Sequence, residues 1–305
     1  LDARWNQLGI NTGVNLNQTR FRYNDLTTDS VDYSDQKNYQ WIASPRLALR
    51  YSFSEKLMAF GIVGYGFSAP SYEETLNAQG FVDGSIKPET GQNREIGIRG
   101  RFWNKRLLFK TSVYSIRVND LLVTKRAAED EFYKINAGKS LHKGLESNLR
   151  IRWLQQSGFN STLNLSYTLT DYRFKEFIDE GNDYSGNRLP GIPTNKLSVQ
   201  LQAGFPLGFY LSTNWIGVDE MPMNDANSKY SDPYQKLDLK AGIKRTIHAN
   251  WHLELYGGMY NVTDTHYASM ILINAPSFGG NPPRYYYPGE PRNYFGGISL
   301  SYTWK

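Results

Sequence analysis

The sequence of 305 residues contains no cysteine, which excludes a disulfide framework, thiolate metal ligands and a thiol nucleophile. It also has no continuous apolar run of about 18 residues, the length that a transmembrane helix requires. The opening segment LDARWNQLGI lacks the charged start and apolar core of a signal peptide. We therefore expect either that a mature chain begins here or that the sequence is a piece of a longer one.

Motifs for catalysis and for cation binding are also missing. There is no Gly-x-Ser-x-Gly elbow and no Walker loop. His248 and His252 have the spacing of a zinc pair, but that spacing works on a helix, and these two flank a turn between expected strands. The acidic segment DEGNDYSGN does not match the ligand spacing of a calcium-binding loop. We therefore expect no enzyme activity, no bound metal and no cofactor.

The net charge and the mean hydropathy exclude few classes of protein. The formal net charge is +5, and Lys and Arg are spread along the chain without one dense face, so we expect no nucleic acid partner. The mean hydropathy of -0.56 is that of a soluble protein. In a membrane β-barrel, however, only every second strand residue meets lipid, and the loops and lumen are polar. Lys and Arg at the rim of such a barrel are expected to contact lipid and lipopolysaccharide phosphates.

Strand-forming residues are abundant: the chain has 22 Tyr, 15 Phe, 7 Trp and 27 Gly. Apolar side chains recur at every second position, most clearly in residues 163–169 and 197–205. About twelve such segments are present, many near the ten or so residues that cross a bilayer as a tilted strand. This alternation of apolar and polar residues, with a period of two, predicts an all-β protein.

The connections between these segments alternate in length. Short ones are SFSEK, WNKR, QQSG, FPLG and IHAN, and the long ones are residues 19–38, 68–91, 125–132, 172–188, 218–232 and 263–291. This alternation is typical of an antiparallel up-and-down transmembrane β-barrel with tight periplasmic turns and long external loops. The polar strand faces carry four arginines, which suit a wide, wet or plugged interior: Arg99, Arg101, Arg150 and Arg152. We expect these arginines to pair with Glu95 and Glu146 inside the barrel.

Several motifs occur in a recognisable order: FSAPSYEE, IKPETGQNREIGIRG, INAGKSLHKGLE, YNVTDTHY and a closing aromatic strand. In this order the chain resembles, over its whole length, the C-terminal half of the barrel of TonB-dependent outer-membrane receptors. The resemblance implies about twelve strands of a barrel of 22, preceded by a plug domain and a TonB-binding segment. Residues 1–305 are then the C-terminal portion of the barrel. The missing N-terminal half, with its plug, is the expected partner and the route of contact with TonB.

The resemblance implies energy-coupled uptake across the bacterial outer membrane, with a ferric siderophore or another iron complex such as ferric citrate as the first candidate ligand. Haem, cobalamin and carbohydrate receptors of the same family are alternatives. A self-contained twelve-strand pore, an autotransporter-like translocator or an outer-membrane lipase is the competing class.

The long loops combine aromatic and basic residues, which suit a bulky, partly apolar and often anionic ligand. The candidate ligand-binding residues are Tyr72, Phe81, Lys125, Arg126, Tyr184, Arg188, Tyr230, Arg284 and Tyr286. In the same region, Ser71 and Glu74 have the spacing of a capping box, which predicts the start of a short helix.

The chain closes on NYFGGISLSYTWK, an alternating strand that runs almost to the last residue. The resemblance implies that this strand is read by the assembly machinery and inserts into the membrane. The lipid-facing set is Tyr294, Ile298, Leu300, Tyr302 and Trp304, with Trp304 at the periplasmic girdle and Lys305 pointing inward by parity.

Overall fold

The protein is described here by a computed structural model, which places residues 1–26, 31–77, 79–128, 131–136, 138–156, 158–179, 181–277, 280 and 282–304. Its main element is one antiparallel sheet of thirteen strands in which each strand pairs with the next along the chain. The strands are β1 (Asp2–Trp5), β2 (Leu8–Asn17), β5 (Ile42–Ser52), β6 (Leu57–Ser68), β7 (Glu89–Phe102), β8 (Leu107–Asn119), β11 (Lys139–Gln156), β12 (Phe159–Glu176), β15 (Asn195–Gly204), β16 (Phe209–Val218), β17 (Tyr234–His248), β18 (Trp251–Tyr260) and β21 (Asn293–Tyr302). The up-and-down all-β prediction is confirmed, with the short strand β1 added to the expected twelve.

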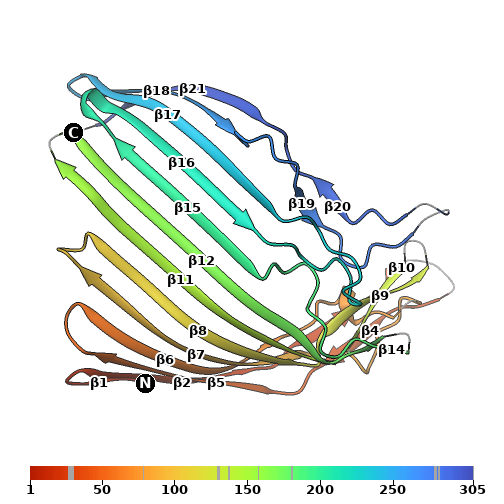
Figure 1. The fold of residues 1–305 in the computed structure, drawn as a ribbon. Coiled ribbons are helices and arrows are strands. Elements are labelled where there is room, and N and C mark those ends of the chain that lie inside the picture. Colours follow the sequence, from red (N-terminus) through yellow and green to blue (C-terminus); the bar gives the residue numbers. More distant parts are fainter. Residues whose placement is uncertain are drawn as a thin grey trace.

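The sheet is a curved wall of tilted strands and is not closed on itself (Figure 1). Its two edges are β1 and β21, which do not pair with each other. Tight turns join the strands at one end, including the 3₁₀ turn η2 (Pro206–Gly208). In the placed ranges, no helix combines the length and apolar character needed to cross a membrane.

Four small hairpins gather at the other end of the wall (Figure 1). They are β3 (Arg20–Tyr23) with β4 (Asp35–Asn38), β9 (Leu122–Ala128) with β10 (Glu131–Asn136), β13 (Ile178–Asp179) with β14 (Asn182–Asp183), and β19 (Ala268–Ile271) with β20 (Tyr286–Pro288). The expected long loops therefore contain strands of their own, and residues 172–176 extend β12. All long connections lie at one end of the wall, as the alternation of loop lengths predicts.

The convex face of the wall is apolar. Ile96, Val113, Leu145 and Leu169 lie opposite one another across β7, β8, β11 and β12 and form one continuous row. Ile96 is 64% exposed and Val113 47% exposed, because none of the described residues covers that face. An apolar band without a protein partner is the arrangement expected of strands that face lipid.

On the concave face, aromatic side chains lie opposite glycines of the neighbouring strand. The five pairs are Phe60 with Gly97, Tyr114 with Gly144, Tyr210 with Gly242, Tyr256 with Gly297 and Phe295 with Gly258. At each glycine, an atom of the facing aromatic side chain lies under 3.0 Å from the place where a Cβ would stand. The missing side chain therefore lets the aromatic side chain lie flat against the wall.

Candidate functional site

The predicted ligand-binding residues all lie at the hairpin end of the wall. We call the described residues among 18–41, 69–88, 120–138, 177–194, 219–233 and 261–292 the loop layer. The most completely buried large side chains are Phe177, Ile86, Asn261, Thr75, Pro70, Pro222 and Ser140, and of these only Ser140 lies in a wall strand. The loop layer therefore has a packed interior of its own.

Tyr72 and Phe81 belong to an aromatic cluster that joins hairpin β3–β4 to residues 72–81. Tyr72 stacks on Tyr23 with ring centroids 4.9 Å apart, and Phe81 lies 4.9 Å from Tyr33. Partial burial raises the pKa of the Tyr72 hydroxyl above its ordinary value. Phe81 keeps 44% of its surface exposed, so it remains available to a ligand while Tyr72 mainly supports the cluster.

The predicted capping box is confirmed at the start of η1 (Glu73–Thr75). Ser71 N–H donates to Glu74 Oε2 at 2.9 Å, and Glu74 N–H donates to Ser71 Oγ at 3.3 Å. Lys134 Nζ of β10 lies 3.6 Å from Glu74 Oε1. The hydrogen bond from Ser71 N–H, assisted by Lys134, lowers the pKa of Glu74. The box therefore also ties this turn to the β9–β10 hairpin.

Tyr184 supports a second cluster around two buried phenylalanines. Phe174 and Phe177 stack at 4.3 Å between centroids, and the Tyr184 ring lies 5.9 Å from Phe177. Partly buried apolar side chains of two loops complete the cluster: Leu121, Val123, Ile135 and Leu189. Tyr184 is thus a packing residue in this structure.

Arg188 is held in a polar network that connects three loops. Arg188 N–H donates to Asn227 Oδ1 at 2.8 Å, and Asn227 Nδ2 donates to Arg188 carbonyl at 2.9 Å. Asn274 Nδ2 in turn donates to Asp225 Oδ2 at 2.7 Å. The Arg188 guanidinium donates to Thr194 Oγ1 at 2.5 Å. Arg188 therefore fixes the loops relative to one another, and its backbone and side chain are both engaged.

Tyr230, Arg284 and Tyr286 remain open to solvent. Tyr230 is 39% exposed and Tyr286 55% exposed, and Arg284 is exposed beside it. Lys125 and Arg126 lie in β9 by their backbone, and their side chains lie outside the described residues. Of the predicted set, the structure therefore leaves Phe81, Tyr230, Arg284 and Tyr286 available to an external ligand.

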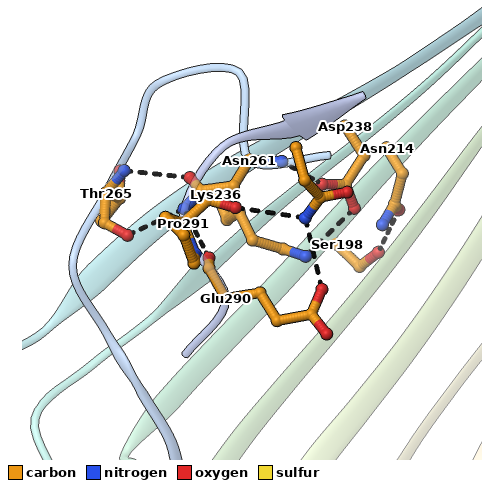
Figure 2. Close-up of polar contacts among 9 residues, drawn as sticks. Ser198, Asn214, Lys236, Asp238, Asn261, Thr265, Glu290 and Pro291 are labelled. Carbon is orange, nitrogen blue, oxygen red and sulfur yellow. Dashed lines mark hydrogen bonds and ion pairs between the residues drawn. The ribbon is translucent and has the colours of Figure 1, made fainter. Parts of the chain in front are cut away.

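Asn261 fixes the last long loop to the wall (Figure 2). Its N–H donates to Asp238 Oδ1 at 2.9 Å, and its side-chain amide donates to the carbonyls of Thr265 at 2.9 Å and Glu290 at 3.1 Å. Its Oδ1 accepts the N–H of Thr265 at 2.9 Å. Asn261 is 1% exposed and has a φ of 51°, a left-handed conformation that asparagine tolerates. One side chain thus closes both ends of residues 261–290.

The concave face near β16–β18 carries paired charges. Lys236 Nζ lies 3.2 Å from Asp238 Oδ2, and Lys240 and Lys244 lie 3.4 and 3.5 Å from the Glu254 carboxylate. Lys236, Asp238, Lys240 and Lys244 occupy alternate positions of β17, and Glu254 lies on the neighbouring β18. The alternating Lys-x-Asp-x-Lys positions already indicate in the sequence that this face of β17 is polar. The ion pairs with Glu254 could not be predicted in this way, because they depend on the register between β17 and β18.

The predicted pairing of the four arginines with Glu95 and Glu146 is wrong. Glu95 Oε1 instead lies 3.8 Å from Lys110 Nζ, on the neighbouring strand. Among the described residues none of these arginines forms an ion pair: Arg150 Nε donates to Asn164 Oδ1 at 2.8 Å and Arg101 Nε to the Glu55 carbonyl at 2.9 Å. The concave pocket of about 1340 Å³ lined by Arg99, Arg101 and Arg150 is therefore more positive than the wall near β17.

The closing strand β21 ends at Tyr302, and four of the five predicted outward residues lie within it, opposite apolar residues of β18. Tyr294, Ile298, Leu300, Tyr302 and Trp304 are 71%, 76%, 56%, 39% and 85% exposed. Trp304 packs edge-on against Tyr302 at 4.9 Å, at the turn end of the wall. Lys305 lies outside the described residues.

Comparison with known proteins identifies the fold. The family model described as "TonB dependent receptor-like, beta-barrel" matches residues 1–262. The ferrioxamine receptor of Yersinia enterocolitica is 27% identical over 272 residues, covering 85% of this chain and 35% of the receptor. The unliganded ferric citrate transporter FecA superposes with a TM-score of 0.74 at 17% identity, covering 97% of this chain and 43% of that one.

The copper transporter OprC superposes almost as well, with a TM-score of 0.73 at 15% identity over 97% of this chain and 45% of that one. The chain therefore spans less than half the length of each of these relatives. Since transporters of ferric citrate and of copper share the same wall, the fold alone does not select the cargo.

Proposed function

The chain belongs to the TonB-dependent receptor family, and from this premise we propose that it forms part of the barrel wall and the external loops of a receptor for energy-coupled uptake of a ferric siderophore or another iron complex. The observation that carries the proposal is the sequence similarity to a ferrioxamine receptor, which extends over 85% of this chain and into the loop layer. The exposed Phe81, Tyr230, Arg284 and Tyr286 suit a bulky and partly anionic complex.

The remaining strands, the plug domain and the TonB-binding segment belong, in this proposal, to a part of the receptor outside these 305 residues. Two observations support this. The sheet has two unpaired edges, which lipid does not tolerate, and the chain covers 35% of the ferrioxamine receptor. In the same proposal the receptor lies in the bacterial outer membrane, with the loop layer outside and the short turns in the periplasm, and transports its ligand without chemical conversion.

Growth on single nutrient sources tests the ligand. A strain lacking the complete receptor gene is grown with ferrioxamine, ferric citrate, haem or cobalamin as the only source of iron or of cobalamin, and with limiting copper. Loss of growth on one iron complex, restored by the gene and dependent on TonB, supports the proposal. A defect confined to haem, cobalamin or copper would assign another cargo, and no defect on any source would reject uptake of these nutrients.

Point variants test the loop-layer site. Tyr286→Ala is expected to lower the affinity for the iron complex by about 5- to 30-fold, because an exposed aromatic contact contributes about 1–2 kcal/mol. Phe53→Ala is the matched control, since Phe53 is also 55% exposed but follows β5 at the turn end of the wall. Equal affinities of the two variants would place the ligand away from β20.

A further inference from the structure

Asp225 is a buried acid in the loop between β16 and β17, where it is 7% exposed. Its Oδ2 accepts a hydrogen bond from Asn274 Nδ2 at 2.7 Å, and its N–H donates to Asn274 Oδ1 at 3.0 Å. The amide of Asn274 therefore uses both its oxygen and its nitrogen on one residue of another loop. Burial of a carboxylate costs free energy unless polar partners compensate it, so the two loops are stable together only in an arrangement that keeps this contact. We call Asp225 and Asn274 the acid–amide pair.

The acid–amide pair lies where three long loops meet. These loops are residues 177–194, 219–233 and 261–292. The carbonyl of Asp225 accepts a hydrogen bond from Asn187 Nδ2 at 2.8 Å, which joins the first loop to the second. The neighbouring contact between Arg188 and Asn227 joins the same two loops. Asp225 is therefore hydrogen-bonded to both of the other loops, and the three form one unit.

Backbone hydrogen bonds connect the acid–amide pair to Tyr230, one of the exposed candidate ligand contacts. Met223 N–H donates to the Lys229 carbonyl at 2.8 Å, and Tyr230 pairs with Pro222 opposite it. The two arms of this loop thus run side by side. Asn274 N–H donates to the Met223 carbonyl at 3.0 Å. Tyr230, which is 39% exposed, is therefore carried by the same two arms that Asn274 holds.

A second path leads from the acid–amide pair to Tyr286. Leu272 lies two residues before Asn274, and its N–H donates to the Tyr285 carbonyl at 2.6 Å. Tyr286 follows directly in β20 and is 55% exposed. The positions of Tyr230 and Tyr286 are therefore linked through Asn274 by short hydrogen bonds between loop residues.

Two aromatic contacts on separate loops bind a ligand more tightly when the loops are already in place. The free energy of ordering the loops at the moment of binding would be subtracted from the affinity. If the competent arrangement were present for about one tenth of the time, the apparent affinity would fall about tenfold. A contact that the ligand never touches can therefore set how tightly the ligand is held.

We propose that Asp225 and Asn274 are positioning residues for the ligand, because they hold Tyr230 and Tyr286 at a fixed separation before the ligand arrives. The inference rests on the proposed function, since it takes both tyrosines as contacts of the iron complex. It also narrows the ligand class to complexes wide enough to touch both loops at once, because a solute that contacts one tyrosine gains nothing from the link. Asp225 is buried and acts through the two loops, not by contact with the ligand.

Exchange of the two side chains tests the acid–amide pair. In Asn274→Asp two carboxylates face each other, so the loops repel. We expect this variant of the complete receptor to bind ferrioxamine about 10-fold more weakly, measured by isothermal titration calorimetry in detergent. In the double variant Asp225→Asn/Asn274→Asp the amide and the carboxylate change places. The amide at position 225 then donates to the carboxylate at position 274, and the affinity should return to within about threefold of the native value.

Label distances test the same link without any ligand. These 305 residues contain no cysteine, so Lys229→Cys and Met270→Cys introduce the only thiols of this part of the receptor. Both positions are exposed, one on each of the two loops that the pair joins. Spin labels at the two thiols should give one narrow distance distribution in the native background and in the double variant. In Asn274→Asp the distribution should broaden.

Asn182→Asp is the matched control, because Asn182 is an exposed residue of β14 in the same loop layer and the exchange adds the same charge. An unchanged affinity or an unchanged label distance in Asn274→Asp would overturn the proposal, and so would a double variant that stays as weak as the single one. An equal loss in Asn182→Asp would assign the effect to charge alone and overturn it too. If the native receptor did not bind ferrioxamine, the proposed cargo would fail, whereas the label distances would still decide whether the pair holds the loops together.

Discussion

The loop layer and the thirteen-stranded wall are stabilised in different ways. The loop layer buries Phe177, Ile86 and Asn261 almost completely and ties its segments together with side-chain hydrogen bonds. The wall has an apolar convex face that stays exposed within this chain and is held by its ladder of backbone hydrogen bonds. The difference shows that one sequence is adapted to two surroundings, with a conventional protein core at one end and an apolar face suited to lipid along the rest.

Removing the aromatic core of the loop layer should have the largest effect. Phe177→Ala is expected to cost about 3–5 kcal/mol of local stability, because Phe177 is 1% exposed and stacks on Phe174. Hydrogen exchange should accelerate in residues 174–189 and stay slow in β16 and β17. Phe81→Ala, at a residue 44% exposed, serves as the control with a smaller effect. Equal loss of protection in the wall would mean that the two regions unfold as one unit.

A charged side chain introduced on the convex face should destabilise the wall, and more strongly the deeper it lies in the bilayer. Leu149→Arg, between Phe109 and Leu165, is expected to cost about 2–4 kcal/mol in a bilayer, and Leu145→Arg, nearer the loop layer, less. Denaturant unfolding in phospholipid vesicles measures both, with Asn148→Arg on the concave face as the control. The same cost at all three positions would contradict a lipid-facing band.

Replacing Asn261 should loosen the junction between the two regions. Asn261→Ala is expected to cost about 1–3 kcal/mol, because the buried carbonyls of Thr265 and Glu290 lose their donor. Hydrogen exchange across residues 261–292 reports the change. Asn261→Gly keeps the left-handed backbone accessible and isolates the side-chain contribution. If the glycine variant were as stable as the native chain, the hydrogen bonds would have little weight.

Acidification should weaken the capping box by a smaller amount. The pKa of Glu74 is lowered in the folded chain, so its contribution is fully present above the ordinary value of 4.5 and is lost as the pH falls through the folded pKa. We expect less than about 1 kcal/mol, because the carboxylate is 36% exposed and partly screened by water. Protection of residues 71–77 measured between pH 6 and roughly pH 3, on both sides of the ordinary Glu pKa, checks this. In Glu74→Gln, which keeps the side-chain oxygen but not the charge, the pH dependence should disappear.

The sequence predicts the strands and their faces because a period of two is a local property that each segment carries by itself. The capping box of Ser71 and Glu74 is predicted for the same reason, since both partners lie within four residues. The pairing of Glu95 with Lys110 is not predicted, because it depends on the register between two strands. The packing roles of Tyr184 and Arg188 are missed as well. The cluster around Tyr184 and Phe177 is completed by side chains of the β9–β10 hairpin, and Arg188 is bonded to Asn227 of another loop, so both depend on how the loops meet.

The glycines opposite the aromatic residues have a consequence for the free space in front of the concave face. Each of the five aromatic side chains has an atom where a methyl group on the facing strand would project. Exchange of Gly297 for alanine would turn the facing Tyr256 away from the wall and narrow the space in front of the concave face locally. The hydrogen-bond ladder and the number of strands would not change. The space in front of the concave face is therefore adjustable one residue at a time, independently of the number and pairing of the strands.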